Sequence, residues 1–198
     1  MAFLARQVQI PSGGLPAGYT RLDYIQSSGT QYINTLFAPN QSSRVDMEVE
    51  MTAIASGNWW FWGSRQASGS GRFTLFSSNG KLGMGFGSSY SSSLTLNTNT
   101  KYNLSVENGV CKANGVTQIT ASAVTFSNTY PLYLFVENRV GTVQEFGSFK
   151  LYSCQIYDNG TLVRDFVPCK NPNNVYGLYD LVNKEFYSNA GSGSFTGG

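Results

Sequence analysis

Three carboxylates gather on one short stretch, and acids at this spacing could hydrolyse a glycosidic bond. Residues 45–51 read VDMEVEM, so on a β-strand Asp46, Glu48 and Glu50 share one face and the apolar residues between them share the other. Retaining glycosidases use two carboxyl groups about 5–5.5 Å apart, which side chains two residues apart on a strand can approach. The alternative is a half-solvated strand whose acids face water or basic residues on neighbouring strands. We favour this alternative because any amphipathic strand shows such alternation.

Histidine is absent from all 198 residues. This excludes Ser-His-Asp and Cys-His catalysis and the usual zinc sites. Cys111, Cys154 and Cys169 lack the short spacing of metal-binding pairs. A two-residue turn at Asn159-Gly160 would place Cys154 opposite Asp165, so a disulfide does not follow from the register. We therefore predict free, buried thiols, no catalytic residue and no cofactor.

All three tryptophans lie within Asn58–Gly63. On a regular strand Trp59 and Phe61 point to one face, and Trp60 and Trp62 to the other. One pair should face the core. The other pair should face solvent, a partner subunit or a ligand, and an exposed indole can stack on a sugar ring. Both pairs could instead be buried, and the polar neighbours could be ordinary loop residues. The glycan-binding residues that we predict are Trp60, Trp62, Asn58, Arg65 and Tyr90.

The elements that must position these residues are short strands. Leu151–Tyr157 and Thr161–Val167 flank Asp158-Asn159-Gly160, a strong signal for a type I′ hairpin. Pro168 cannot donate to a ladder and is expected to end the second strand. Two further strands are predicted at residues 176–180 and 185–187. The pattern indicates a hairpin followed by a meander.

The composition indicates a single all-β domain. The chain has 22 glycines, 14% aromatic residues and only 12% charged residues, as short strands joined by tight turns require. No long stretch shows capped helical periodicity. The net charge of +2 comes without a basic stripe, which argues against nucleic-acid binding. No apolar run approaches the roughly 20 residues of a membrane span.

Two segments carry a family resemblance: Leu15–Thr35 (LPAGYTRLDYIQSSGTQYINT) and Lys150–Gly198. They closely resemble the opening and closing segments of concanavalin-A-like, laminin-G-like domains from bacteriophage, prophage and gut-bacterial surface proteins. Residues 61–65, 72–76 and 80–81 lie where this family has similar short strands. The resemblance covers residues 15–198 and implies a jelly-roll sandwich of two antiparallel sheets at a virion or cell surface. It implies no particular ligand, because the fold hosts lectins, glycosidases and spacers.

The resemblance also bears on catalysis and metals. Laminarinase-type glycosidases of this fold carry acids in the order Glu-x-Asp-x-(x)-Glu, whereas residues 46–50 here have the order Asp-x-Glu-x-Glu. Many related lectins hold calcium at the rim, for which Asp158, Asp165 and Asp180 are the candidates. No short run has the spacing of a calcium loop, and turns account for Asp158 and Asp180, so we expect no metal. Phage fibres are commonly trimers, so the resemblance favours a homotrimer.

Residues 1–14 precede the domain and form a predicted amino-terminal arm. Phe3, Leu4, Val8 and Ile10 are unusually apolar for a free tail. Two interpretations stay open. The arm is either a frayed terminus or an anchor that orders on another virion protein.

The resulting hypothesis is a non-enzymatic virion surface protein, on a fibre, tail or capsid, with a lectin-like domain that adheres to host or mucosal glycans. Its expected partners are other virion proteins through the arm and polysaccharide, without nucleic acid or membrane. One alternative is a purely structural decoration module without a glycan ligand. The other is a glycoside hydrolase.

Overall fold

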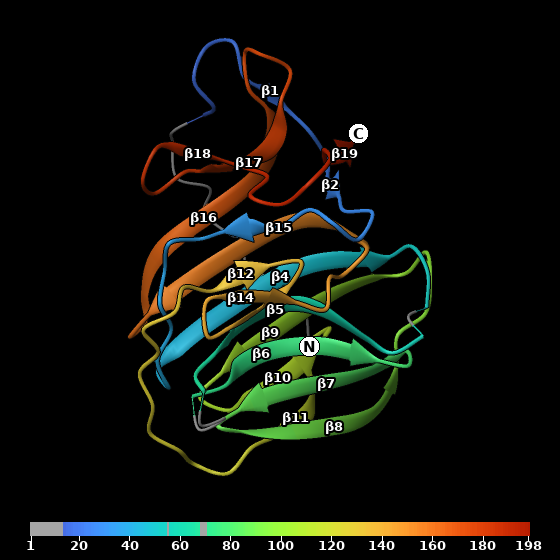
Figure 1. Cartoon of the computed structure of the whole chain (residues 1–198), viewed down its shortest axis with the longest axis vertical. Helices are drawn as coiled ribbons and strands as arrows, with labels where there is room; N and C mark the ends of the chain where they lie inside the picture. Colours follow the sequence, from blue (N-terminus) through green and yellow to red (C-terminus); the bar gives the residue numbers. More distant parts are fainter. Residues whose placement is uncertain (1–13, 55, 68–70) are drawn as a thin grey trace, which may run out of the picture.

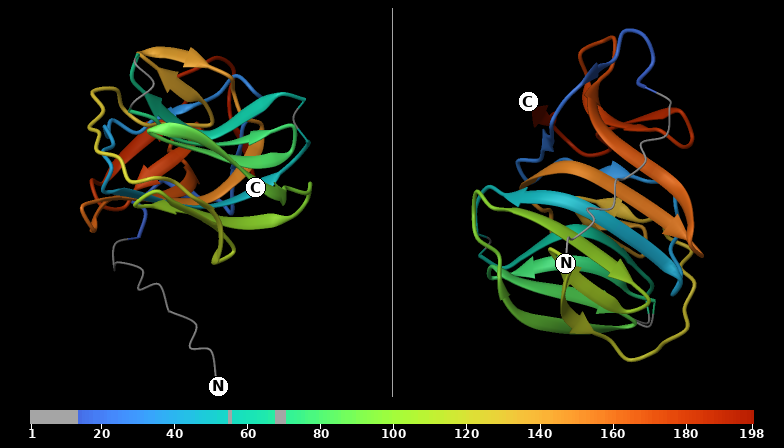
Figure 2. Two further views of the ribbon diagram at one scale, coloured as in Figure 1. Left: turned by 90° about the horizontal axis from the view of Figure 1, so that it is seen from below. Right: turned by 180° about the vertical axis from the view of Figure 1, so that it is seen from behind.

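A computed structural model describes residues 14–54, 56–67 and 71–198 of the chain (Figure 1). The described residues form two β-sheets packed face to face, and the left view of Figure 2 shows the two layers edge-on. They contain no helix, so none that could span a membrane. The predicted all-β jelly-roll sandwich is confirmed. The proposed anchor residues Phe3, Leu4, Val8 and Ile10 lie outside the described residues.

Sheet A has eleven strands in the order β11-β10-β9-β4-β15-β16-β17-β18, with β1 beside β16, β2 beside β15 and β19 beside β2. Its strands are β1 (Thr20–Arg21), β2 (Ile25–Gln26), β4 (Ser43–Met51), β9 (Lys101–Glu107), β10 (Val110–Ala113), β11 (Val116–Thr120), β15 (Phe149–Asp158), β16 (Thr161–Lys170), β17 (Tyr176–Asp180), β18 (Glu185–Ser188) and β19 (Thr196–Gly197). Pairing of β19 with β2 brings the two ends of the domain together.

Sheet B has eight strands in the order β14-β13-β5-β6-β7-β8, with β12 paired to both β5 and β3. Its strands are β3 (Ile33–Asn34), β5 (Asn58–Arg65), β6 (Phe73–Ser78), β7 (Lys81–Phe86), β8 (Ser88–Thr95), β12 (Tyr133–Leu134), β13 (Glu137–Arg139) and β14 (Thr142–Gln144). The strand pairs are antiparallel except β13 and β5, which run parallel.

The core lies between the two sheets. On β4 the four apolar residues are buried in it, while Arg44, Asp46, Glu48 and Glu50 face outward, as the alternation predicts. Aromatic rings join the layers: Phe149 stacks on Phe135 with the ring centroids 4.4 Å apart. A second, smaller cluster (Val167, Cys169, Tyr179 and Leu181) lies apart from this core and is covered by Leu15 and Tyr19.

The carboxyl-terminal hairpin and meander form as predicted. Asn159 and Gly160 both have positive φ, 47° and 80°, which is the type I′ geometry. The predicted strands at 176–180 and 185–187 correspond to β17 and β18. Local turn chemistry therefore specifies this part of the fold.

Two details of the hairpin differ from the predictions. A register shift between Ile156 and Tyr157 places Cys154 opposite Phe166 rather than Asp165, because a bulge at Val163 adds one residue to β16. Pro168 does not end β16, which continues to Lys170. The Pro168 carbonyl accepts a hydrogen bond from the Leu22 N–H, so the side of Pro168 that lacks an N–H faces the end of β1. The pairing of β1 stops at Arg21, so the missing N–H does not interrupt the ladder.

The predicted buried, free thiols of Cys111, Cys154 and Cys169 are confirmed.

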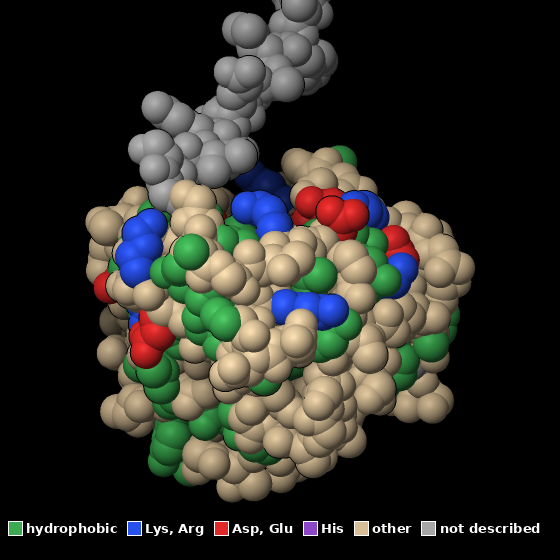
Figure 3. All heavy atoms as spheres, turned by 90° about the horizontal axis from the view of Figure 1, so that it is seen from above, with side chains coloured by type: hydrophobic (Ala, Val, Ile, Leu, Met, Phe, Trp, Pro, Cys, Tyr) green, Lys and Arg blue, Asp and Glu red, His purple; other side chains and the backbone are tan. Residues whose placement is uncertain are grey.

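The surface carries few charges because only 12% of the residues are charged. Figure 3 shows an end of the molecule covered mostly by backbone and uncharged polar atoms, with small separate groups of basic and acidic side chains. The sparse charge makes the two places where charged side chains do cluster, one on each sheet, the natural places to look for a site.

A polar cleft on the outer face of sheet A

Four neighbouring strands of sheet A build a polar row on its outer face. Ser105 of β9, Asp46 of β4, Gln155 of β15 and Asp165 of β16 are successive register partners. A second row, one step along the strands, holds Asn103, Glu48 and Ser153. The right view of Figure 2 looks onto this side of the molecule.

These rows line a cleft of about 490 Å³. Arg21 of β1 and Gly115 of the β10–β11 turn also line it, and Val167 and Leu181 contribute apolar surface. The cleft thus combines carboxylate, amide, hydroxyl and guanidinium groups with an apolar patch. Its volume lies within the range of small-molecule sites.

Hydrogen bonds fix the centre of the cleft. The Tyr157 hydroxyl donates to Gln155 Oε1 at 3.0 Å, and Gln155 Nε2 donates to Asp165 Oδ1 at 3.1 Å. Asp165 is only 7% exposed, and its backbone N–H donates to the buried Asp180 carboxylate. The amide orientation is therefore set before any ligand arrives, which lowers the entropic cost of binding.

Several polar groups of the cleft keep unused hydrogen-bonding capacity. Within the described part of the chain, the side chains of Asn103, Ser105 and Ser153 make no hydrogen bond to the protein, although all three line the cleft. They can donate to or accept from a ligand hydroxyl.

The acids of β4 are paired with basic residues. The pairs are Arg44–Asp46 at 3.1 Å, Lys101–Glu48 at 3.2 Å and Lys150–Glu50 at 2.7 Å. The prediction that acids face basic residues across the ladder is confirmed for Glu48 and Glu50, whereas Asp46 pairs with Arg44 of its own strand. The hydrogen bond from Lys150 lowers the pKa of Glu50. Burial raises the pKa of Asp46, and Arg44 opposes this rise.

Two aromatic rings brace these pairs at the sides of the cleft. The Arg44 guanidinium lies 3.7 Å from the centroid of Tyr157, and Lys101 Nζ lies 3.5 Å from the centroid of Tyr152. Such cation–π contacts hold the long basic side chains in place. The charged groups are therefore arranged as a fixed frame around the polar rows.

The predicted glycan-binding residues do not form one site. A bulge in β5 pairs Trp60 with Phe76 and Trp62 with Leu75, which turns the two indoles to opposite faces. The expectation that Trp60 and Trp62 share a face is wrong. Trp62 is fully buried in the core, so no sugar can reach it, and Trp60 is 6% exposed with its Nε1 donating to Glu145 at 2.6 Å.

The other three predicted residues are scattered. Asn58 is exposed at the start of β5, and Arg65 at its end is half-buried on the outer face of sheet B. They are separated by roughly 20 Å of strand. Tyr90 packs against the core, and its hydroxyl accepts a hydrogen bond from the Ser122 N–H at 3.2 Å.

The calcium candidates have protein partners. Asp158 accepts from Asn40 at 2.8 Å. Asp180 accepts from the backbone of Val182 and the side chain of Asn183, which stabilises the turn after β17. In the described ranges no three His, Cys, Asp or Glu side chains gather as metal ligands would.

Sequence reasoning missed most of the cleft. Gln155, Asn103 and Ser105 carry no motif, and they come together only because four strands align in one register. Alternation on residues 101–107 gives which residues of β9 face outward. On β15 a bulge at Tyr152 reverses the alternation, and the register shift at Ile156–Tyr157 then decides that Gln155 meets Asp165.

Comparisons with known proteins support the fold. No protein-family model matches the sequence, and no curated protein matches it. Among solved structures, the chain is similar to a "putative carbohydrate binding protein" from Bacteroides ovatus ATCC 8483, with a TM-score of 0.61 and 12% identity. The match covers 89% of this chain and 60% of that one, so this chain spans less than two thirds of its length.

Proposed function

We propose that the protein is a non-enzymatic, lectin-like carbohydrate-binding protein and that the cleft on sheet A holds the saccharide. The observation that carries this proposal is the polar row of Ser105, Asp46, Gln155 and Asp165 on the floor of the cleft. The similarity in fold to a protein described as carbohydrate binding supports it.

The chemistry of the cleft suits a sugar. Sugar hydroxyls both donate and accept, and the cleft offers carboxylate acceptors, an oriented amide, free hydroxyls and the Arg21 donor. The C–H face of a sugar ring needs apolar contact, for which Val167 and Leu181 are available. Bonds to the charged groups give such a site its orientation and specificity.

The pairing of the β4 acids speaks against the hydrolase alternative. A glycosidase needs one carboxyl group that stays protonated and one that stays ionised near the scissile bond. Here each of the three acids is already held in an ion pair with a basic side chain within 3.2 Å, whereas hydrolysis needs two carboxyl groups directed at the scissile bond. Incubation of a bound polysaccharide with the protein should release no reducing ends.

The setting that we propose is a virion surface, where the domain adheres to host or mucosal glycans on a fibre, tail or capsid. Its support is the resemblance of residues 15–35 and 150–198 to phage and gut-bacterial surface domains. Residues 1–14 would attach the domain to another virion protein, and the working form would be a homotrimer. Deletion of residues 1–14 should then leave the sandwich folded but abolish incorporation into particles.

A glycan array with matched variants tests the binding function. Glu48→Gln removes a charged acceptor that lines the cleft, and Glu107→Gln removes a more exposed acid of the same face that does not line it. Because both ion pairs are exposed, neither change should alter stability much. We expect Glu48→Gln to weaken binding about tenfold, the effect of losing one charge-assisted hydrogen bond, and Glu107→Gln to leave it unchanged. If the wild-type protein bound none of the host polysaccharides on the array, this would instead support a purely structural module.

A further inference from the structure

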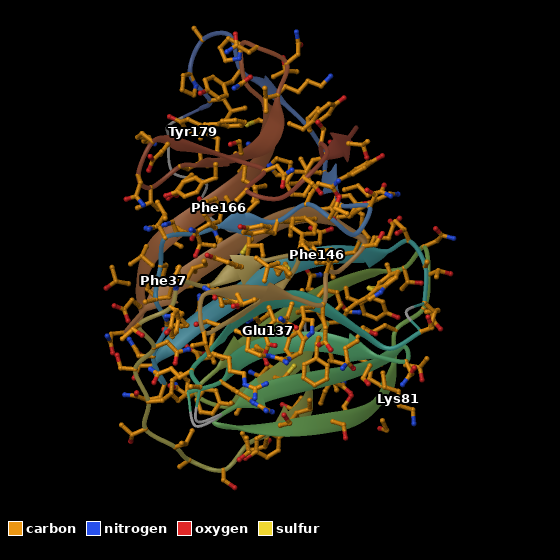
Figure 4. All side chains as sticks on the ribbon, viewed as in Figure 1. Phe37, Lys81, Glu137, Phe146, Phe166 and Tyr179 are labelled. Atoms are coloured by element: carbon orange, nitrogen blue, oxygen red, sulfur yellow. The ribbon has the colours of Figure 1, made fainter. Side chains whose placement is uncertain are left out.

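The outer face of sheet B carries a second cluster that the cleft does not explain. Glu137, Gly63, Thr74, Gly85 and Ser89 are successive register partners across β13, β5, β6, β7 and β8. Figure 4 labels Glu137 over the middle of this sheet.

The glycines of this row give their neighbours room to lie flat on the sheet. A Cβ on Gly63 would come within 2.8 Å of Glu137, and one on Gly85 within 2.3 Å of the Thr74 hydroxyl. As a result Glu137 is fully buried and Thr74 is 1% exposed, although both lie on an outer face. Burial of a carboxylate at such a position is costly and calls for an explanation.

The next row along the strands consists of three arginines. Arg139 of β13 is the register partner of Arg65 of β5, and the pairing of Ser64 with Phe73 places Arg72 beside Arg65. Like charges directly opposite one another destabilise a sheet. Burial lowers the pKa of Arg72, and the neighbouring positive charge of Arg65 lowers it further.

Only one of these arginines is neutralised within the described ranges. Arg139 contacts Glu137 Oε2 through Nη2 at 2.6 Å and Nε at 2.8 Å. All 11 acidic residues of the chain lie in the described ranges. Within these ranges, no acidic residue forms an ion pair with Arg65 or Arg72. Two adjacent positive charges are therefore left without a counter-charge.

Several polar atoms of these two arginines and of their neighbours lack a hydrogen-bond partner within the described residues. Nε of Arg65, Nε of Arg72, Oγ1 of Thr74 and Oε1 of Glu137 are all buried and make no hydrogen bond within the described residues. Buried polar groups in proteins almost always have a partner. The three donors could serve an oxyanion, and the Glu137 oxygen can only accept, which requires a donor such as a ligand hydroxyl.

We propose that this arginine row binds an acidic saccharide, with its oxyanion between Arg65 and Arg72 and one of its hydroxyls donating to Glu137. A planar guanidinium can donate two parallel hydrogen bonds to two oxygens of a carboxylate or a sulfate group. Trp60 and Phe76, whose ring centroids lie 4.6 Å apart, form the row on the other side of Glu137 and Thr74 and provide adjoining apolar surface. This site lies on the opposite sheet from the cleft and does not depend on it.

Titration calorimetry with three oligosaccharides of equal length tests the proposal: one carries uronic carboxylates, one carries sulfates, and one is neutral. The wild-type protein should bind at least one acidic probe at least tenfold more tightly than the neutral one, and added salt should weaken that binding. Which acidic probe binds more tightly identifies the oxyanion. Equal affinity for all three probes, or no binding of the acidic ones, would overturn the proposal.

The double variant Arg65→Gln/Arg72→Gln should lose at least tenfold in affinity for the acidic probe. Its control is Lys81→Gln/Lys112→Gln, which removes the same net charge at exposed positions away from the row and should keep the affinity within twofold. The double variant should also melt no lower than the wild type, since it removes a repulsive pair, so a loss of binding cannot be ascribed to unfolding. Equal losses in both variants would overturn the proposal by showing that net charge alone attracts the probe. Glu48→Gln should leave this binding unchanged, which separates the site from the cleft.

Discussion

Trp60 and Trp62 lie two residues apart and serve different surfaces. Trp62 is fully buried in the core, whereas the Trp60 Nε1 donates to the Glu145 carboxylate. We expect Trp62→Ala to lower the free energy of unfolding by about 3–5 kcal/mol, because it leaves a large cavity. Trp60→Phe should cost about 1.5–3 kcal/mol through loss of one hydrogen bond to a charged group. Urea denaturation measures both, and a Trp62→Ala protein within about 1 kcal/mol of wild type would contradict the packing described here.

The Lys150–Glu50 pair makes stability depend on pH. The hydrogen bond from Lys150 holds the pKa of Glu50 below its ordinary value of 4.5, so folding favours the ionised carboxylate. This contribution is present above about pH 4.5 and is lost as the pH falls through the lower folded-state pKa. Urea midpoints of wild type should therefore fall more steeply than those of Glu50→Gln as the pH decreases below 4.5. Parallel pH profiles would contradict the assignment.

The three thiols should be inert in the folded protein. Burial raises the pKa of Cys111 to about 12 and that of Cys169 to about 11, and Cys154 is fully buried. The thiolate is the reactive form, so alkylation by iodoacetamide at about pH 8 should be negligible in buffer and should reach all three residues in denaturant. Fewer than three modified residues after denaturation without reductant would indicate a disulfide.

The hairpin of β15 and β16 is the element whose sequence dictates its shape most directly. Gly160 has a φ of 80°, and an alanine Cβ at this position would meet no atom within 4 Å, so a change to alanine strains only the backbone. We expect Gly160→Ala to cost about 1–2 kcal/mol. Gly14→Ala, also in open space but without a positive φ, should cost almost nothing. Equal effects of the two changes would show that the turn does not need its left-handed residue.

Elements were predictable where the information is local. The Asn159-Gly160 turn and the alternation on residues 45–51 specify β15, β16 and the inward and outward faces of β4. The bulges in β5 and β16 were not predictable, because a bulge is defined by the partner strand as much as by its own residues. Each bulge displaced one prediction: the face of Trp62 and the partner of Cys154.

At the scale of the whole molecule, the two sheets present different chemistry to their surroundings. Sheet A offers a cleft floored by carboxylates and amides, and sheet B offers an arginine row beside a buried carboxylate. In the sequence most of these residues stand at ordinary polar positions. Their grouping depends on register across four or five strands that are far apart in the chain, which no local pattern encodes.

The oligomeric state is open to a direct measurement. If the protein works as the homotrimer that we propose, light scattering of the full chain should give about three times the 21.6 kDa of one chain. A stable mass of 21.6 kDa at high concentration would contradict the trimer and leave the cleft proposal intact, since one chain supplies every residue of the cleft.

An NMR titration of the labelled protein, with a neutral saccharide that binds it on the array, tests the location of the binding site most directly. The amide and side-chain signals of Asn103, Ser105, Gln155 and Asp165 should shift with the saccharide, and those of the outer face of sheet B should not. A titration midpoint about tenfold higher for Glu48→Gln, with an unchanged midpoint for Glu107→Gln, would place the saccharide in the cleft. Shifts confined to any other surface would contradict the central claim that the outer face of sheet A is the saccharide-binding site.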